Sequence, residues 1–149
     1  MATDPSLDAV RRQRKGVRTA LDALERALAA PSSGRAAEWR SGVDERVAAL
    51  AEAWGAHAAV TEQPGGLFDD VVARAPRLAG RVARLRQEHV DVAAQLAAIS
   101  QAGSGGDPDA DVAAVGEAAL ATMGAIVRHR NTGSSLLYEA YFVDIDAAD

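Results

Sequence analysis

The 149-residue chain contains no cysteine. It therefore forms no disulfide bond, and it offers neither a thiolate metal ligand nor a cysteine nucleophile. This composition fits a reducing compartment, and the first ten residues show no apolar core of the kind found in signal peptides. We accordingly expect a cytoplasmic protein.

Aromatic residues are scarce as well, at 4% of the chain, although 48% of the residues are hydrophobic and many of those are alanine. A β-sandwich draws on aromatic and β-branched residues, so the composition favours helices that approach one another closely. No apolar run approaches the roughly 20 residues that span a bilayer, so we expect no membrane association.

The formal net charge of −5 argues against nucleic acid as the main partner. One basic cluster near the N-terminus is expected to be a solvated helix face. It consists of Arg11, Arg12, Arg14, Lys15 and Arg18.

Apolar residues recur at steps of three and four, which is the periodicity of helices. The pattern predicts long helices over residues 5–30, 35–62, 76–101 and 108–141, and a short helical piece over 67–75. We predict an all-α chain in which residues 1–149 form one domain, an antiparallel four-helix bundle with a short extra helix between the second and third helices. The acidic tail, at about residues 142–149, is expected to fray.

The chain has three histidines, and each falls on the apolar stripe of a different predicted helix. His57 follows Trp54 by three residues, His89 follows Leu85 by four, and His129 follows Ile126 by three at the edge of a broader face. A polar ring inside a packed core needs a hydrogen-bond partner or a metal ion. Neutral imidazole suits iron, copper, nickel or zinc, and facing helices of a bundle bring such ligands together.

The loops decide whether these histidines meet. With tight loops, His57 and His129 lie at similar heights and His89 lies about 10 Å away along the bundle. The extra turn at residues 67–75 is the element that could close this gap.

Carboxylates near the histidines are expected to lie mostly on the surface. Glu62 is the nearest candidate for an oxygen ligand, because it ends its helix five residues after His57. Glu88 is adjacent to His89 and is expected to point elsewhere, and Glu139 also lies off the histidine face. Tyr138 and Tyr141 are expected at the rim of the core.

The chain resembles the hemerythrin-like (HHE cation-binding) family over roughly residues 50–146. The resemblance rests on three segments: His57 to Glu62 followed by Gly66 to Phe68; Pro76 to Leu78 leading to Leu85 to His89; and His129 to Tyr141 with Asp144 to Asp146. The alanine- and arginine-rich composition is similar to that of family members from bacteria with GC-rich genomes. The resemblance implies a four-helix bundle with a di-iron site of five histidines and two carboxylates. It also implies a role in binding dioxygen, nitric oxide or peroxide, or in storing iron.

The implied ligand set is only partly present. The first helix has no histidine where the family has one, and Thr61 stands at the usual bridging carboxylate, with Glu62 one step later. Leu85 and Ala93 stand four residues either side of His89, where a second histidine is expected. Gly133 and Ser134 stand where the last helix should carry a carboxylate.

Three interpretations follow. The first is a hemerythrin-like protein that binds iron, mononuclear or dinuclear, through His57, His89 and His129, with Glu62 as an oxygen ligand; a histidine-ligated haem is its variant. The second is a bundle without metal that acts as a binding or structural and regulatory module. Its histidines would bond to Thr61, Thr122 or backbone carbonyls.

The third interpretation is a small-molecule pocket with Arg130, Tyr138 and Tyr141 at its mouth. A homodimer is compatible with all three interpretations. The sequence contains no Ser-His-Asp pattern, P-loop or dinucleotide-binding fingerprint, so hydrolase, kinase and dehydrogenase assignments have no support.

Overall fold

The computed structural model describes residues 5–143, and these residues form helices and no strands. Four long helices are present: α1 (Pro5–Ala29), α2 (Ala36–Glu62), α4 (Ala79–Ile99) and α5 (Pro108–Tyr138). A shorter helix, α3 (Leu67–Arg74), and a 3-10 turn, η1 (Pro76–Leu78), lie between α2 and α4. A π-helical turn, η2 (Glu139–Val143), follows α5. The all-α prediction is therefore confirmed for the described residues.

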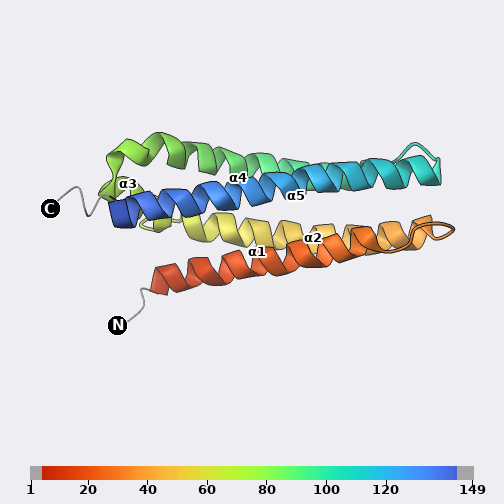
Figure 1. The fold of residues 1–149 in the computed structure, drawn as a ribbon, viewed down its shortest axis with the longest axis horizontal. Coiled ribbons are helices and arrows are strands. Elements are labelled where there is room, and N and C mark those ends of the chain that lie inside the picture. The colour runs from red at the N-terminus through yellow and green to blue at the C-terminus, as the bar shows by residue number, and fades with distance from the viewer. Residues whose placement is uncertain (1–4, 144–149) are drawn as a thin grey trace.

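The long helices lie side by side along one axis, and α1 and α4 run in the direction opposite to α2 and α5 (Figure 1). The third helix starts later than the pattern indicated, because Pro76 opens a 3-10 turn before α4 begins at Ala79. The expected fraying of the acidic tail concerns mainly residues 144–149, which lie outside the described part of the chain.

Local sequence signals set the helix ends. The Asp107 side chain accepts hydrogen bonds from the backbone N–H groups of Asp109 and Ala110, and Pro108 occupies the first turn of α5. The Asp69 carboxylate accepts a 2.8 Å hydrogen bond from the Gly65 N–H at the start of α3. The Asp107 cap satisfies polar groups that a helix leaves without intrahelical partners, and the Asp69 bond fixes the loop that precedes α3.

The apolar core consists of two clusters. The first cluster fills the half of the bundle near the α1–α2 loop and includes Leu24, Leu50, Trp54, Leu96 and Ile126. The second fills the half near α3 and includes Val10, Phe68, Leu78, Leu85 and Leu136. At the level where the two clusters meet, each long helix carries one polar residue on its inward-facing stripe. These four residues, which we call the polar layer, are Arg14, His57, His89 and His129.

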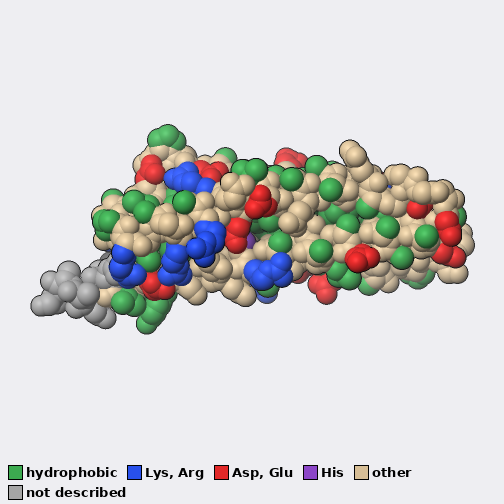
Figure 2. All heavy atoms as spheres, turned by 90° about the horizontal axis from the view of Figure 1, so that it is seen from above, with side chains coloured by type: hydrophobic (Ala, Val, Ile, Leu, Met, Phe, Trp, Pro, Cys, Tyr) green, Lys and Arg blue, Asp and Glu red, His purple; other side chains and the backbone are tan. Residues whose placement is uncertain are grey.

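Charged side chains tie together the end of the bundle that holds α3. Glu139 of η2 accepts hydrogen bonds from Arg77 at 3.2 Å and from Arg81 at 2.6 Å. The Tyr141 hydroxyl donates to Asp70 of α3. Lysine and arginine side chains accordingly gather toward this end in Figure 2, while the other half of that face carries mostly apolar and uncharged side chains.

One described helix is long and apolar enough to cross a membrane. The segment Pro108–Val143, which is α5 with the following turn, has a mean hydropathy of 1.5 in its most apolar window. This statement rests on length and composition only, and the core helix of a helical bundle can meet the same two criteria. In this structure, α5 places Val115, Ile126 and His129 in the bundle interior.

We predict that Gly55→Ala raises the free energy of unfolding by about 0.5–1 kcal/mol in urea denaturation. Gly55 is exposed in the middle of α2, and an added Cβ would meet no atom within 4 Å. Gly103→Ala is the opposite case, because Gly103 has φ +67° and its Cβ would lie 2.4 Å from the backbone oxygen of Asp111. A loss of stability for Gly55→Ala would contradict the helical environment described here.

Candidate metal centre

The three histidines meet in the middle of the bundle. His57 comes from α2, His89 from α4 and His129 from α5, and all three are buried. Their ring centroids are separated by 4.7 Å for His89 and His129, 5.2 Å for His57 and His89, and 5.7 Å for His57 and His129. One nitrogen from each ring can be chosen so that all three lie within 4.8 Å of one another.

The 10 Å offset expected for His89 is absent. Residues 67–78 form α3 and η1, which carry the chain beyond the end of α2 before α4 begins (Figure 1). Because α4 starts farther out than a tight loop would place it, His89 lies level with the other two histidines. The short helix thus makes a common site possible.

Two of the rings face each other closely. The Nε2 atoms of His89 and His129 are 3.1 Å apart. On the far side of His129, its Nδ1 lies 3.0 Å from Oε2 of Glu88. On the far side of His89, its Nδ1 lies 3.6 Å from Oε1 of Glu62. Each of these two histidines therefore has a carboxylate beside its outer nitrogen.

The expectation that Glu88 is only a surface charge was wrong, because its carboxylate contacts a buried histidine. Its side chain points away from His89 on its own helix, as the one-residue spacing requires, but it reaches His129 on α5. Contact across helices cannot be read from spacing along one helix. Glu62 lies at the end of α2 as expected and also lies 3.8 Å from Arg86.

Some ring nitrogens have no hydrogen-bond partner. Among the described residues, Nδ1 of His57 and Nδ1 of His89 are buried without one. The threonine hydroxyls that could have served them bond within their own helices instead. Thr61 donates to the carbonyls of His57 and Ala58, and Thr122 donates to the carbonyl of Ala118. The threonine–histidine bonds expected for a metal-free bundle are therefore not formed.

Aromatic rings hold the cluster in place. The indole of Trp54 lies 5.0–5.5 Å from all three imidazole centroids. Its Nε1–H donates a 3.0 Å hydrogen bond to the carbonyl of His89, which links α2 to α4 at the level of the cluster. Phe68 of α3 stacks on the His89 ring at 5.6 Å. Packing of this kind restricts the rotamers of the histidines.

Burial keeps these imidazoles neutral. Loss of solvation, with smaller contributions from His129 and Arg14, lowers the pKa of His57 to about 4. Loss of solvation, together with the neighbouring histidines and Arg86, lowers the pKa of His89 to about 3. Burial also lowers the pKa of His129, although Glu88 acts in the opposite direction. Neutral imidazole is the form that ligates metal ions.

The first helix contributes an arginine to the polar layer. Arg14 lies between Val10 and Val17 on the buried stripe of α1, and its guanidinium donates a 2.7 Å hydrogen bond to the Ser134 hydroxyl. The other members of the basic cluster are exposed as expected: Arg11, Arg12, Lys15 and Arg18. The solvated-face interpretation is therefore wrong for Arg14 alone.

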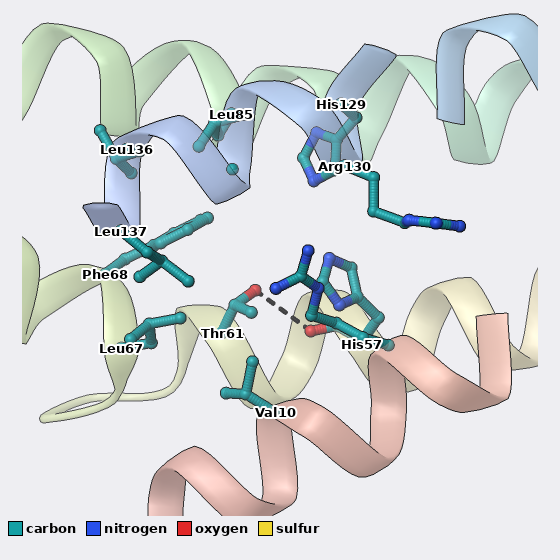
Figure 3. A pocket seen from close by; sticks show the side chains of 12 residues that line it. Val10, His57, Thr61, Leu67, Phe68, Leu85, His129, Arg130, Leu136 and Leu137 are labelled. Carbon is teal, nitrogen blue, oxygen red and sulfur yellow. Dashed lines mark hydrogen bonds between the residues drawn. The ribbon is translucent and has the colours of Figure 1, made fainter. Parts of the chain in front are cut away.

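A small cavity of about 40 Å³ lies beside the cluster between α1, α2, α3, α4 and α5. Figure 3 shows His57, His129 and Arg130 on one side of it and Leu67, Phe68 and Leu137 on the other. Tyr138 is exposed and Tyr141 bonds to Asp70, so neither lies at this cavity. Of the three residues expected at a pocket mouth, Arg130 lines this cavity, whereas Tyr138 and Tyr141 line the open groove that adjoins it along α1, α5 and η2.

Comparison with known proteins gives one match. The family model described as "Hemerythrin HHE cation binding domain" matches residues 5–137, which includes all four long helices except the last residue of α5. No curated protein and no solved structure matches the chain.

We predict that the metal-free protein loses stability as the pH falls from 7 to 4. Unfolded histidines have a pKa near 6.5 and take up protons through most of this range, whereas folded His57 and His89 take them up only near pH 4 and below. For a histidine with a folded pKa of about 4, the loss at pH 4 is about 3 kcal/mol. Urea denaturation at a series of pH values measures it.

The matched variant is His57→Gln, whose side chain does not titrate. Its unfolding free energy should fall less steeply with decreasing pH than that of the unchanged chain. Equal slopes in the two proteins would show that His57 is not the group responsible.

Proposed function

Because the chain belongs to the hemerythrin HHE cation-binding family, we propose that His57, His89 and His129 hold one iron ion in the bundle core. The proposed role is the binding of dioxygen, nitric oxide or peroxide at this ion, or oxidative chemistry on such a molecule. The observation that carries the proposal is the pairing of His89 with His129.

The protonation states of this pair favour a cation between the rings. If Nδ1 of His129 donates to Glu88, its Nε2 carries only a lone pair. If His89 then donates through Nε2, its own Nδ1 presents a lone pair toward the Glu62 carboxylate. If His89 instead protonates Nδ1, two lone pairs face each other at 3.1 Å. A bound cation removes the conflict, because it accepts both lone pairs while each outer N–H faces a carboxylate.

The spacing of the pair also fits a metal ion. Ligand nitrogens lie about 2.0–2.1 Å from a bound ion, so two neighbouring ligands of one ion are about 3.0–3.4 Å apart. The observed Nε2–Nε2 distance of 3.1 Å falls in this interval. Imidazole nitrogen is a suitable donor for iron, and family membership favours iron over other first-row metals.

A single ion fits the chain better than two. Three positions at which the family resemblance implies further ligands are Thr61, Leu85 and Gly133, and all three line the cavity. The Thr61 hydroxyl donates to carbonyls of its own helix, the Leu85 side chain has no donor atom, and Gly133 has no side chain. A second ion in this cavity would therefore meet residues that cannot ligate it at these three positions.

Haem is disfavoured by size. A bis-histidine haem places its two axial nitrogens on opposite faces of the macrocycle, about 4 Å apart. Here the rings contact one another, and the adjoining cavity has a volume of only about 40 Å³. A porphyrin would require the helices to separate.

The surrounding residues prepare the site. Glu88 orients His129 and sets its tautomer. Glu62 makes no hydrogen bond to His89, but its carboxylate lies 3.6 Å from Nδ1 and favours a proton on that nitrogen. We therefore propose that Glu62 acts through His89 rather than as a direct oxygen ligand. Apolar side chains of both core clusters keep bulk water away. The ion itself would supply Lewis-acid and redox chemistry at coordination positions that the protein leaves open.

We predict that the purified protein binds one equivalent of iron, measured by metal analysis after anaerobic loading with Fe²⁺. His89→Ala and His129→Ala should each abolish stoichiometric binding, because each removes one of the paired nitrogens. Circular dichroism at 222 nm checks that the variants remain helical. Iron content below about 0.1 equivalent in the unchanged chain, or full occupancy in both folded variants, would overturn the proposal.

We predict that Glu88→Gln weakens iron binding about 10- to 100-fold, because the amide no longer fixes the donor side of His129. The matched control is Glu117→Gln, an exposed residue on α5. Competition with a chelator measures both affinities. Equal affinities in the two variants would remove Glu88 from the site.

A further inference from the structure

Two arginines at the polar layer have no acidic partner. Within residues 5–143, the hydrogen bond from Arg14 to Ser134 is the only polar contact of its side chain, and Arg130 has no hydrogen bond or ion pair. Most arginines at the α3 end differ in this respect, since Arg74, Arg77, Arg81 and Arg86 all contact carboxylates. The two guanidiniums without a carboxylate partner are thus an exception near the buried site.

The two guanidiniums are also close enough to repel each other. Burial, followed by the charge of Arg130, lowers the pKa of Arg14. Both residues line the 40 Å³ cavity and the smaller one behind it, next to Trp54. Neither is fully exposed, so solvent only partly screens the repulsion. An anion between them would turn this unfavourable arrangement into a favourable one.

A third polar group faces the same space. His57 lines both cavities, is 8% exposed, and has a buried Nδ1 without a hydrogen-bond partner in the described chain. An unpaired buried nitrogen costs free energy until something binds it. The two cavities are therefore bordered by two guanidiniums and by the His57 imidazole.

The remaining walls specify what kind of anion fits. Across from the polar groups stand Leu67, Phe68 and Leu137, with Val10 and Leu136 beside them (Figure 3). Phosphate or sulfate would leave oxygen atoms against these side chains without donors. A carboxylate with a short hydrocarbon chain matches both sides. The cavity has room for about three water molecules, so the chain must be short.

A groove on the surface adjoins the cavity. An open groove along α1, α5 and η2 shares Val10, Arg14 and Leu137 with the cavity. Its outer part is apolar and includes Tyr138 and Phe142, whose stacked rings are exposed. A small organic anion could thus reach the polar layer between α1 and α5 without disturbing the α2–α4 side of the cluster.

We propose that the chain binds a small monocarboxylate of about two or three carbon atoms, with its carboxylate between Arg14 and Arg130 beside His57 and its hydrocarbon end against Leu67, Phe68 and Leu137. The site adjoins the histidine cluster but does not require a metal ion. It gives the protein a second ligand, distinct from the dioxygen, nitric oxide or peroxide considered above.

Isothermal titration calorimetry of the full chain with propionate tests the proposal, in chelator-treated and in iron-loaded protein. Propionamide is the matched neutral probe, because it has the same shape without the charge. We expect saturable binding of propionate to the metal-free protein, at least about tenfold tighter than propionamide, since hydrogen bonds between two charged groups are the stronger kind. Sulfate serves as a charged probe without a hydrocarbon chain and should bind more weakly than propionate.

Variants identify the residues. Arg130→Gln and Arg14→Gln should each weaken propionate binding at least about tenfold. Arg128→Gln on α5 and Arg18→Gln on α1 remove the same charge from exposed positions and should leave the affinity unchanged. Arg130→Lys retains the charge without the forked donor and should fall between the two groups. Circular dichroism again establishes that each variant is folded.

Three results would overturn the proposal: no saturable propionate binding, equal binding of propionamide, or sulfate binding that exceeds propionate binding. Unchanged affinity in folded Arg130→Gln and Arg14→Gln would do so as well. Failure of the proposed iron site would appear separately, as absence of metal from the loaded protein. Propionate binding to chelator-treated protein does not depend on that result.

Discussion

The bundle is organised around a polar layer buried between two apolar clusters. Imidazole rings from three helices meet there, and their nitrogens cannot all find hydrogen-bond partners within the described chain. An apolar core of this size would be more stable without such groups, because buried polar atoms without partners are costly. The arrangement makes physical sense as a site for a cation, whose binding would offset that cost.

The layer is also asymmetric in charge. Glu62 and Glu88 lie beside the outer nitrogens of His89 and His129, while Arg14 and Arg130 border the cavity on the α1 side. A cation is therefore favoured between the histidines, and an anion is favoured between the arginines. The two carboxylates and the two guanidiniums thus make one part of the bundle centre favourable for a cation and the adjoining part favourable for an anion.

Membership of the hemerythrin family explains the bundle, but this chain departs from the family's ligand set. The first helix supplies Arg14 to the layer, and α2, α4 and α5 supply one histidine each. Where further ligands would be expected, Thr61, Leu85 and Gly133 line a cavity. The positions without the implied ligands are thus the positions that line the cavity, and both features favour a mononuclear site with space beside it.

The sequence alone determined the helical class, the approximate helix bounds and the burial of the three histidines. Each of these follows from residue periodicity, which is a local property of one helix. The same periodicity also placed Arg14 on the buried stripe, four residues after Val10 and three before Val17, although its charge concealed that signal.

The tertiary structure decided which side chains of different helices contact one another. Glu88 reaches His129 across helices, and α3 with η1 sets the height of His89; neither follows from spacing along one helix. Distances between helices depend on loop geometry and packing of the whole bundle, so only the fold could bring three separate histidines to one point.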